Sequence, residues 1–145
     1  MKTYSGTITK LLPNQIFCFG ANTSGKHGKG AALFARQHCG AIYGVPRGPQ
    51  GKAYAIITKD LTKSVHPSVS VQSIVEQIGE LYDYAIRNPE FDFIVAYSGT
   101  GSNLNYYTPQ EMADMFSSLE IPENIVFEES VSTLLKNENS LDTLG

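Results

Sequence analysis

Apolar residues along this chain gather in short continuous runs, and polar segments that contain glycine separate the runs. A run without alternating polar residues is typical of a strand that is covered on both faces of a sheet. The pattern therefore predicts buried strands at residues 16–19, 53–58, 91–97 and 125–127. β-Branched and aromatic residues also predict a strand and turn over residues 2–10.

Helical spacing of apolar residues occurs between these strands. An Ala-rich run predicts a helix from about Gly30 to Gly40, where glycine can take the left-handed cap conformation. Apolar residues recur at helical spacing over 71–85, and Asn88-Pro89 ends this second helix. A third helix, over 108–118, opens with the form of a capping box, Thr108-Pro109-Gln110-Glu111. Strands alternating with helices predict an α/β domain with a mixed or mostly parallel sheet and helices on both faces.

The length of 145 residues fits one domain. Residues 41–52 hold three glycines and two prolines, which predicts a loop. The chain turns polar and loses its periodicity after about Glu129, so we expect a domain over 1–129 and a loose tail over 130–145. The alternative for the tail is a short terminal helix built on Val131, Leu134 and Leu135.

Two predicted strands run directly into glycine-containing loops, at residues 20–31 and 98–102. Glycine lets a ligand approach the backbone, and the first amides of a helix have no partner within the helix. A loop of this kind before a helix suits a phosphate. Two such loops at one sheet edge would hold a diphosphate from opposite sides, whereas a single loop is equally explained as a turn between strand and helix.

The first loop also matches the start of a P-loop, G-x-x-x-x-G-K, at Gly20, Gly25 and Lys26. A P-loop requires Ser or Thr at the next position to hold Mg²⁺, and this chain has His27 there. The glycines that follow would break the helix that a P-loop enters. A nucleoside triphosphatase is therefore a minor alternative.

Composition narrows the class of protein further. The net charge of −3 argues against a general binder of nucleic acids or membrane surfaces. No apolar run approaches the roughly 20 residues of a membrane span, and Met1-Lys2-Thr3 does not lead into a signal segment, so we expect a cytoplasmic protein. Cys18 and Cys39 have no paired spacing, which predicts buried, reduced thiols and no metal site.

The chain resembles the macrodomain family of ADP-ribose-binding proteins. Gly6-Thr7-Ile8-Thr9, the strand ending in Ala21-Asn22, and the strand running into Ser98-Gly99-Thr100-Gly101 are similar to that family's motifs. The pattern F-G-x-N-x-x-G-x-H-G-x-G-A-A at 19–32, followed by Thr58-Lys59-Asp60, resembles a compact microbial and phage branch. The resemblance covers about residues 5–120 and implies a three-layer α/β/α domain.

The resemblance implies that Asn22 contacts the distal ribose and that residues 28–31 enclose it. Residues 98–102 would donate backbone N–H groups to the diphosphate, and Tyr106 or Tyr107 would cover a ring or sugar. The acidic residue that reads the adenine amino group in the family is Thr7 here, which leaves the preferred base open. The implied ligand-binding residues are Gly20, Ala21, Asn22, Gly28, Gly30, Ala31, Lys59, Ser98, Gly99, Thr100, Gly101, Ser102 and Tyr106.

Macrodomain-like enzymes hydrolyse ADP-ribosyl adducts or ADP-ribose 1″-phosphate, commonly without a metal or other cofactor. Asn22 would orient the substrate, and His27, Lys59 and Asp60 are the candidates for proton transfer, so the predicted catalytic residues are Asn22, His27 and Asp60. Two alternatives remain: His27 as a structural loop residue and Asp60 as a turn or ion-pair residue. We expect a hydrolase whose partner is ADP-ribose or an ADP-ribosylated macromolecule. A non-catalytic module that sequesters ADP-ribose or a cyclic derivative is the second hypothesis.

Overall fold

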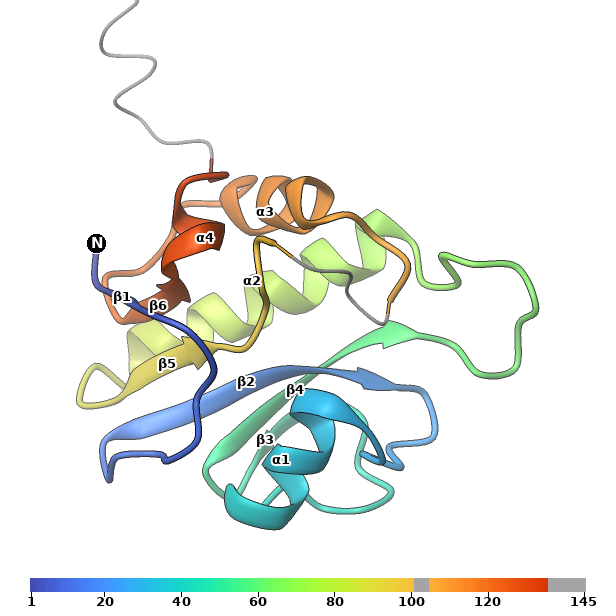
Figure 1. The fold of residues 1–145 in the computed structure, drawn as a ribbon, viewed down its shortest axis with the longest axis horizontal. Coiled ribbons are helices and arrows are strands. Elements are labelled where there is room, and N and C mark those ends of the chain that lie inside the picture. Colours follow the sequence, from blue (N-terminus) through green and yellow to red (C-terminus); the bar gives the residue numbers. More distant parts are fainter. Residues whose placement is uncertain (101–104, 136–145) are drawn as a thin grey trace, which may run out of the picture.

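The computed structural model describes residues 1–100 and 105–135. These residues form an α/β domain around one mixed sheet with the strand order β1-β6-β5-β2-β4-β3, in which only β3 is antiparallel to its neighbour (Figure 1). The predicted α/β fold with a mixed sheet is confirmed. In chain order the elements are β1 (Thr3–Tyr4), β2 (Gln15–Asn22), α1 (Gly30–His38), β3 (Gly48–Gln50), β4 (Ala53–Lys59), α2 (Val71–Arg87), β5 (Asp92–Val95), α3 (Pro109–Ser117), β6 (Ile125–Glu128) and α4 (Glu129–Ser132).

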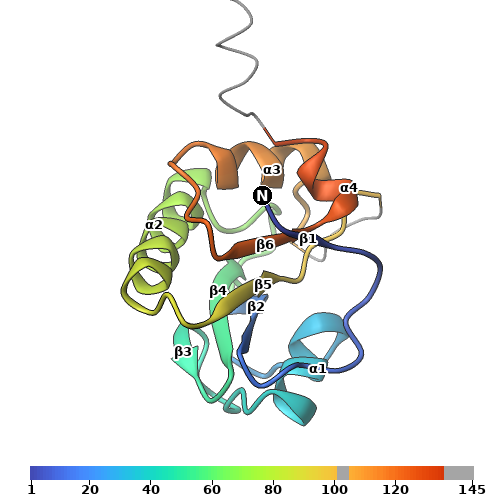
Figure 2. The same cartoon turned by 90° about the vertical axis from the view of Figure 1, so that its left-hand side faces the viewer.

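Both faces of the sheet are covered, as the apolar strands predicted. Along β2, Phe17 and Phe19 pack on the side of α1, and Ile16 and Cys18 face the core formed with α2 and α3. Figure 2 shows α1 on one side of the sheet and α2 and α3 on the other. This arrangement makes three layers. Cys18 and Cys39 are buried free thiols, as predicted, and burial raises the pKa of Cys39 to about 11.

The predicted helices are present with nearly the expected ends. Gly40 follows α1 with a φ of +78°, as expected for a left-handed residue after a helix. The capping box of α3 is complete: Thr108 accepts from the Glu111 amide, and Glu111 accepts from the Thr108 amide. No helix in the part of the chain described is long and apolar enough to cross a membrane.

Two edge strands differ from the prediction. The N-terminal strand is only two residues long, because Gly6 has a φ of +78° and turns the chain away. The segment 41–52, predicted as a loop, contains the three-residue strand β3, which pairs antiparallel with Ala53–Ala55. An edge strand tolerates Pro49 because the missing N–H needs no partner on the outer side.

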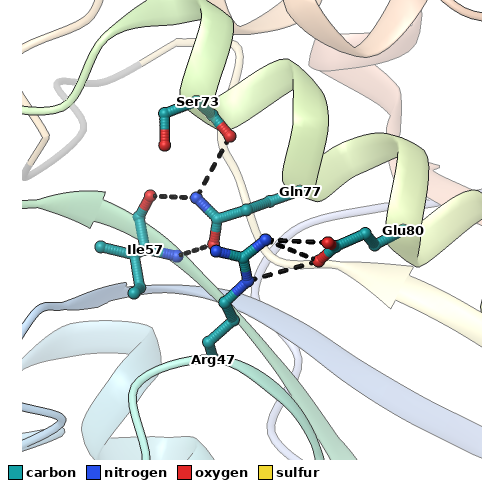
Figure 3. A network of polar contacts seen from close by, with 5 residues as sticks. All are labelled: Arg47, Ile57, Ser73, Gln77 and Glu80. Carbon is teal, nitrogen blue, oxygen red and sulfur yellow. Dashed lines mark hydrogen bonds and ion pairs between the residues drawn. The ribbon is translucent and has the colours of Figure 1, made fainter.

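The pairing of β3 with β4 stops at Gly48, which lies opposite Ala55. Further along β4, a side chain of α2 makes the backbone hydrogen bonds that a neighbouring strand would make (Figure 3). Gln77 accepts from the Ile57 amide at 2.7 Å and donates to the Ile57 carbonyl at 2.9 Å, so it mimics a neighbouring strand. Its side chain is buried, where an unpaired backbone group would be costly. Arg47 donates to both carboxylate oxygens of Glu80 at 2.8 Å and ties the segment before β3 to α2.

The end of the described chain packs onto the domain. Helix α4 follows β6 directly, and Val131 and Leu135 are buried in the core shared with α2 and α3. The expectation of a loose tail from residue 130 is therefore wrong for residues 130–135, because two apolar side chains suffice to anchor a single turn. The alternative of a short terminal helix is confirmed for Val131, which lies in α4, whereas Leu134 and Leu135 follow the helix. Residues 136–145 lie outside the described residues.

Candidate functional site

Two cavities open where the parallel strands end, and they share a wall formed by Gly30, Ala31, Ala96, Tyr97 and Ser98. We call the first, of about 540 Å³, the lysine cavity. Its lining includes three lysines and the start of α1: Lys26, Lys29, Lys59, Gly30, Ala31 and Ala32. The second, of about 710 Å³, is the aromatic cavity. Its walls include Tyr4, Ile8, Phe17 and Phe34.

Both predicted glycine loops border the lysine cavity, because each follows a parallel strand whose carboxyl end lies at this edge. Eight of the predicted ligand-binding residues line it: Gly20, Ala21, Asn22, Gly28, Gly30, Ala31, Lys59 and Ser98. Thr100 lines the aromatic cavity. Gly101 and Ser102 fall outside the described residues.

The lysine cavity is electropositive on a chain of net charge −3. Its described lining contains three lysines and no acidic side chain. Helix α1 begins there, and Lys29 at its N-cap makes no side-chain hydrogen bond to the helix. The first residues of α1 thus border the cavity at the positive end of the helix dipole, where amides have no partner within the helix. The combination suits a phosphate group.

Asn22 and Lys59 are neighbours at the ends of β2 and β4. The pairing of the two strands shifts register after Ala21, which sets Asn22 opposite Lys59. The Asn22 side-chain oxygen accepts from the Ser24 amide at 3.1 Å and from the Ser24 hydroxyl at 2.7 Å. Since a backbone amide can only donate, this contact fixes which end of the carboxamide is oxygen. No described residue accepts a hydrogen bond from the Asn22 side-chain nitrogen.

Tyr106 lies beside Lys59 rather than in the cavity wall. The Lys59 Nζ is 5.3 Å from the centroid of the Tyr106 ring, and His66 stacks on the same ring at 4.5 Å. Tyr106 is 58% exposed. The ring is therefore placed to hold Lys59 by a cation–π contact. Tyr107, the alternative cover, is buried and donates to the Val69 carbonyl at 2.6 Å, so it does not face a ligand.

His27 does not line either cavity. Its side chain is fully buried, edge-on to Phe19, and its Nε2 donates to the Val45 carbonyl at 3.0 Å. This buried position favours the structural alternative, and the catalytic role of His27 stays a prediction that the structure does not support. The glycine-rich surroundings suggested an open loop, but the ring folds back under β2 and joins the loop to the segment before β3.

Asp60 also serves local structure. Its carboxylate accepts from the Thr62 hydroxyl at 2.6 Å and from the Thr62 amide at 2.9 Å, and these bonds lower its pKa. Asp60 is absent from the described lining of both cavities. These contacts favour the turn-residue alternative, and the catalytic role of Asp60 stays a prediction that the structure does not support, since an aspartate that holds the turn after a strand looks the same in sequence as a catalytic one.

The second glycine loop has fewer free amides than expected. The Gly99 amide donates to the Ser130 hydroxyl at 2.8 Å, and the Thr100 amide donates to the Ser98 hydroxyl at 3.2 Å. Gly99 therefore contacts α4 rather than a ligand. The expected donation of these two amides to a diphosphate is not available in this arrangement.

Eight further residues line the lysine cavity and were not predicted as site residues: Lys26, Lys29, Ala32, Thr58, Leu61, Ala96, Tyr97 and Asn105. Lys26 and Lys29 lie in the first loop, just before the predicted start of the helix at Gly30. Two positive charges at that place in the sequence already indicate an anion-binding loop. Asn105 is buried by contacts that only the fold creates. Within the described ranges, no group of three His, Cys, Asp or Glu side chains is placed to hold a metal ion.

Tyr97, in the wall shared by the two cavities, carries a buried hydroxyl that makes no hydrogen bond of ordinary geometry with the described residues. Burial raises its pKa, and the nearby Thr58 and Asn105 side chains partly oppose that shift. Gly20 lies against the hydroxyl: a Cβ on it would be 2.6 Å from the oxygen. Burial of a hydroxyl without a hydrogen-bond partner lowers the free energy of unfolding by about 1–3 kcal/mol.

We expect Tyr97→Phe to leave the free energy of unfolding unchanged or to raise it by up to about 1 kcal/mol, because the variant removes an unsatisfied group. Urea denaturation measures the effect. Tyr82→Phe is the matched control, since the Tyr82 hydroxyl donates to the Phe116 carbonyl at 2.5 Å and its loss should cost about 1 kcal/mol. Equal destabilisation by both variants would show that Thr58 or Asn105 satisfies Tyr97.

Comparison of the chain with models of known protein families, with curated proteins and with solved structures gives no match. The cavities and the sequence motifs are therefore the features of this chain that indicate its function.

Proposed function

We propose that this protein is a macrodomain-like hydrolase that binds ADP-ribose, free or attached to a macromolecule, across the two cavities. The observation that carries the proposal is the junction of an electropositive cavity with an aromatic one. A nucleoside diphosphate sugar suits such neighbours, because the flat faces of its base stack on apolar and aromatic side chains and its diphosphate is anionic. The macrodomain resemblance over residues 5–120 supports the same assignment.

In this proposal the diphosphate and the distal ribose occupy the lysine cavity. The lysines and the first amides of α1 neutralise the phosphates. Asn22 faces the ribose with its side-chain nitrogen, since its oxygen is held by Ser24. Of the three candidates for proton transfer, Lys59 alone lines the cavity in the part of the chain described.

The proposed reaction is attack of water on the anomeric carbon of the distal ribose, or on the phosphorus of the 1″-phosphate. The bond to the leaving oxygen breaks, and that oxygen departs with the bonding electron pair as a carboxylate, alkoxide or phosphate oxygen, while the attacking water releases its proton to the leaving oxygen or to solvent. Lys59 offers its positive charge to this oxygen, and Asn22 orients the ribose. Neither role requires a metal.

One observation favours the second hypothesis, a non-catalytic module that binds or sequesters ADP-ribose or a cyclic derivative. His27 and Asp60, two of the three candidates for proton transfer, are absent from the described linings of both cavities. A binding module needs only the lysines and the loops. Turnover assays separate the two hypotheses.

Calorimetry with ADP-ribose in the presence of EDTA tests the proposed ligand. We expect binding without metal, and we expect Lys59→Gln to weaken it at least tenfold, about 1.4 kcal/mol, because the variant removes a charge beside the phosphates. Lys63→Gln removes the same charge from an exposed position outside both described cavity linings and should change the affinity less than twofold. Tighter binding of ATP that requires Mg²⁺ would contradict the proposal and favour a P-loop.

A further inference from the structure

The charges of this chain are separated along its sequence. Residues 1–75 contain nine Lys and Arg side chains and one acidic residue, Asp60, whereas residues 76–145 contain two Lys and Arg and thirteen Asp and Glu. The net charge of −3 is therefore a difference between a basic half and an acidic half. Such asymmetry is typical of proteins that bind a polyanion with one face, and a negative net charge does not exclude that face.

The fold converts this separation along the sequence into a separation in space. Helix α1 belongs to the basic half and contains no acidic residue. Helices α2 and α3 carry five acidic residues, Glu76, Glu80, Asp83, Glu111 and Asp114. Because α1 covers one face of the sheet and α2 and α3 cover the other, the side of α1 is the basic side of the molecule (Figure 2).

On the basic side, cations and exposed tyrosines form a connected series from α1 to the end of β4. Arg36 donates to the Lys26 carbonyl at 3.4 Å, and its guanidinium carbon lies 5.9 Å from the centroid of the Tyr43 ring. The three lysines line the lysine cavity together, and Lys59 in turn lies over the Tyr106 ring. We call this series the basic stripe; its members are Tyr43, Arg36, Lys26, Lys29, Lys59 and Tyr106.

The cations of the basic stripe are not neutralised by acidic side chains. Lys26, Lys29 and Arg36 are exposed, and in the part of the chain described none of the four cations lies in an ion pair. Asp60 follows Lys59 directly, but its carboxylate accepts from Thr62 and forms no ion pair with the stripe. The stripe therefore keeps its charge available for phosphate groups.

The tyrosines of the stripe indicate which polyanion it fits. Tyr43 is 62% exposed and Tyr106 is 58% exposed, and each has a cation of the stripe over its ring. Proteins that bind single-stranded nucleic acids combine cations along the backbone with aromatic rings on which bases stack. A duplex keeps its bases stacked on each other, so it would contact the cations alone.

The acidic side of a second copy is the other occupant with suitable charge. The basic and acidic sides lie on opposite faces of the sheet, so this contact would join molecules head to tail and would propagate unless it closed into a ring. It would also give the exposed rings no special role. The stripe thus favours a nucleic acid over a second copy.

We propose that the basic stripe binds single-stranded nucleic acid, with phosphates on Arg36 and the lysines and a base stacked on Tyr43. The inference goes beyond the proposed function and does not require ADP-ribose. Arg36 and Tyr43 lie outside both described cavity linings, so they separate binding of a strand from binding in the lysine cavity.

Fluorescence anisotropy of a labelled oligothymidylate with the full chain tests the inference. We expect binding at low salt that weakens as salt rises, and Arg36→Gln should reduce the slope of log affinity against log salt by about 0.7, the value of one phosphate contact on a single strand. Arg87→Gln is the matched control, because Arg87 is an exposed arginine of α2, in the acidic half. It should leave affinity and slope within twofold of the wild type.

Tyr43→Ala should weaken binding at least fivefold, because the ring on which a base stacks is lost. Tyr43→Phe keeps the ring and should bind as the wild type does. The duplex of the same length should bind at least fivefold more weakly than the single strand. An oligouridylate distinguishes RNA from DNA, and tighter binding of either one supports the inference.

Three results would overturn the inference: no salt-dependent binding of either oligonucleotide, equal affinity for the duplex, or losses in Arg36→Gln and Tyr43→Ala no larger than in their controls. Self-association at low salt that Arg36→Gln abolishes, measured by light scattering in the absence of oligonucleotide binding, would assign the stripe to a second copy. Calorimetry with ADP-ribose should give the same affinity for Arg36→Gln, Tyr43→Ala and the wild type. Failure of ADP-ribose to bind the wild-type protein would therefore overturn the proposed function alone.

Discussion

Gly99→Ala is expected to lower the free energy of unfolding by about 3 kcal/mol, at the upper end of what forced overpacking costs. A Cβ at this position would lie 2.8 Å from the Val131 amide nitrogen and closer still to the Ser130 carbonyl group. These are backbone atoms, so no side-chain rotation relieves the contact. The helix α4 must move, which exposes Val131 and breaks the bond from the Gly99 amide to Ser130.

Urea denaturation of the wild type and the variant measures the loss. Gly28→Ala is the matched control, because a Cβ on Gly28 meets nothing within 4 Å and the residue does not have a positive φ. Its effect should stay below about 0.5 kcal/mol. A loss in Gly99→Ala that does not exceed the loss in Gly28→Ala would show that α4 does not hold this loop.

The parts of the fold that were predictable depend on local sequence. The apolar periodicity of α2 and the capping box at Thr108 determine their elements within a few residues, so the prediction needed no knowledge of the tertiary structure. The edge strand β3 is different. Its Gly-Pro composition indicates a loop, and it becomes a strand only because β4 offers it a free edge.

The sequence predicts those parts of the site whose position follows from the order of strands, loops and helices. A strand that runs into a glycine loop and a helix places that loop at the carboxyl edge, and two such units bring Asn22 and Ser98 to one cavity. The failures concern contacts between distant segments. Nothing near Gly99 in the sequence indicates that the Ser130 hydroxyl, 31 residues later, occupies its amide.

The structure does not support a catalytic role for His27 or Asp60, and the reasons differ. His27 has the chemistry of a general base, but it is buried against Val45, which approaches through the loop before β3. Asp60 lies at a strand end, and Thr62, only two residues later, supplies donors that favour a turn role. Residue type and spacing identify groups capable of catalysis, whereas the fold decides which of them face the ligand.

Asn22→Asp is expected to reduce hydrolysis of ADP-ribosyl substrates about a hundredfold, which corresponds to about 2.7 kcal/mol of transition-state stabilisation. The side-chain oxygen of Asn22 accepts from the amide and hydroxyl of Ser24, and an aspartate oxygen can accept the same bonds. The turn should therefore survive. The variant removes the side-chain N–H donor that we place on the distal ribose.

The added negative charge in the lysine cavity should itself weaken ADP-ribose binding about tenfold, as we expect for the loss of the Lys59 charge. If the donor acts mainly in the transition state, the turnover number falls clearly further than the affinity. The assays are turnover on ADP-ribosylated protein, on ADP-ribosylated nucleic acid and on ADP-ribose 1″-phosphate, with calorimetry for affinity. Ser24→Ala keeps Asn22 and removes only the hydroxyl that binds its oxygen, so the variant should retain most of the wild-type rate. Equal losses of rate and affinity in Asn22→Asp would instead assign Asn22 to ground-state binding. A wild-type protein that binds ADP-ribose and turns over none of the three substrates is the binding module, and the hydrolase is then abandoned.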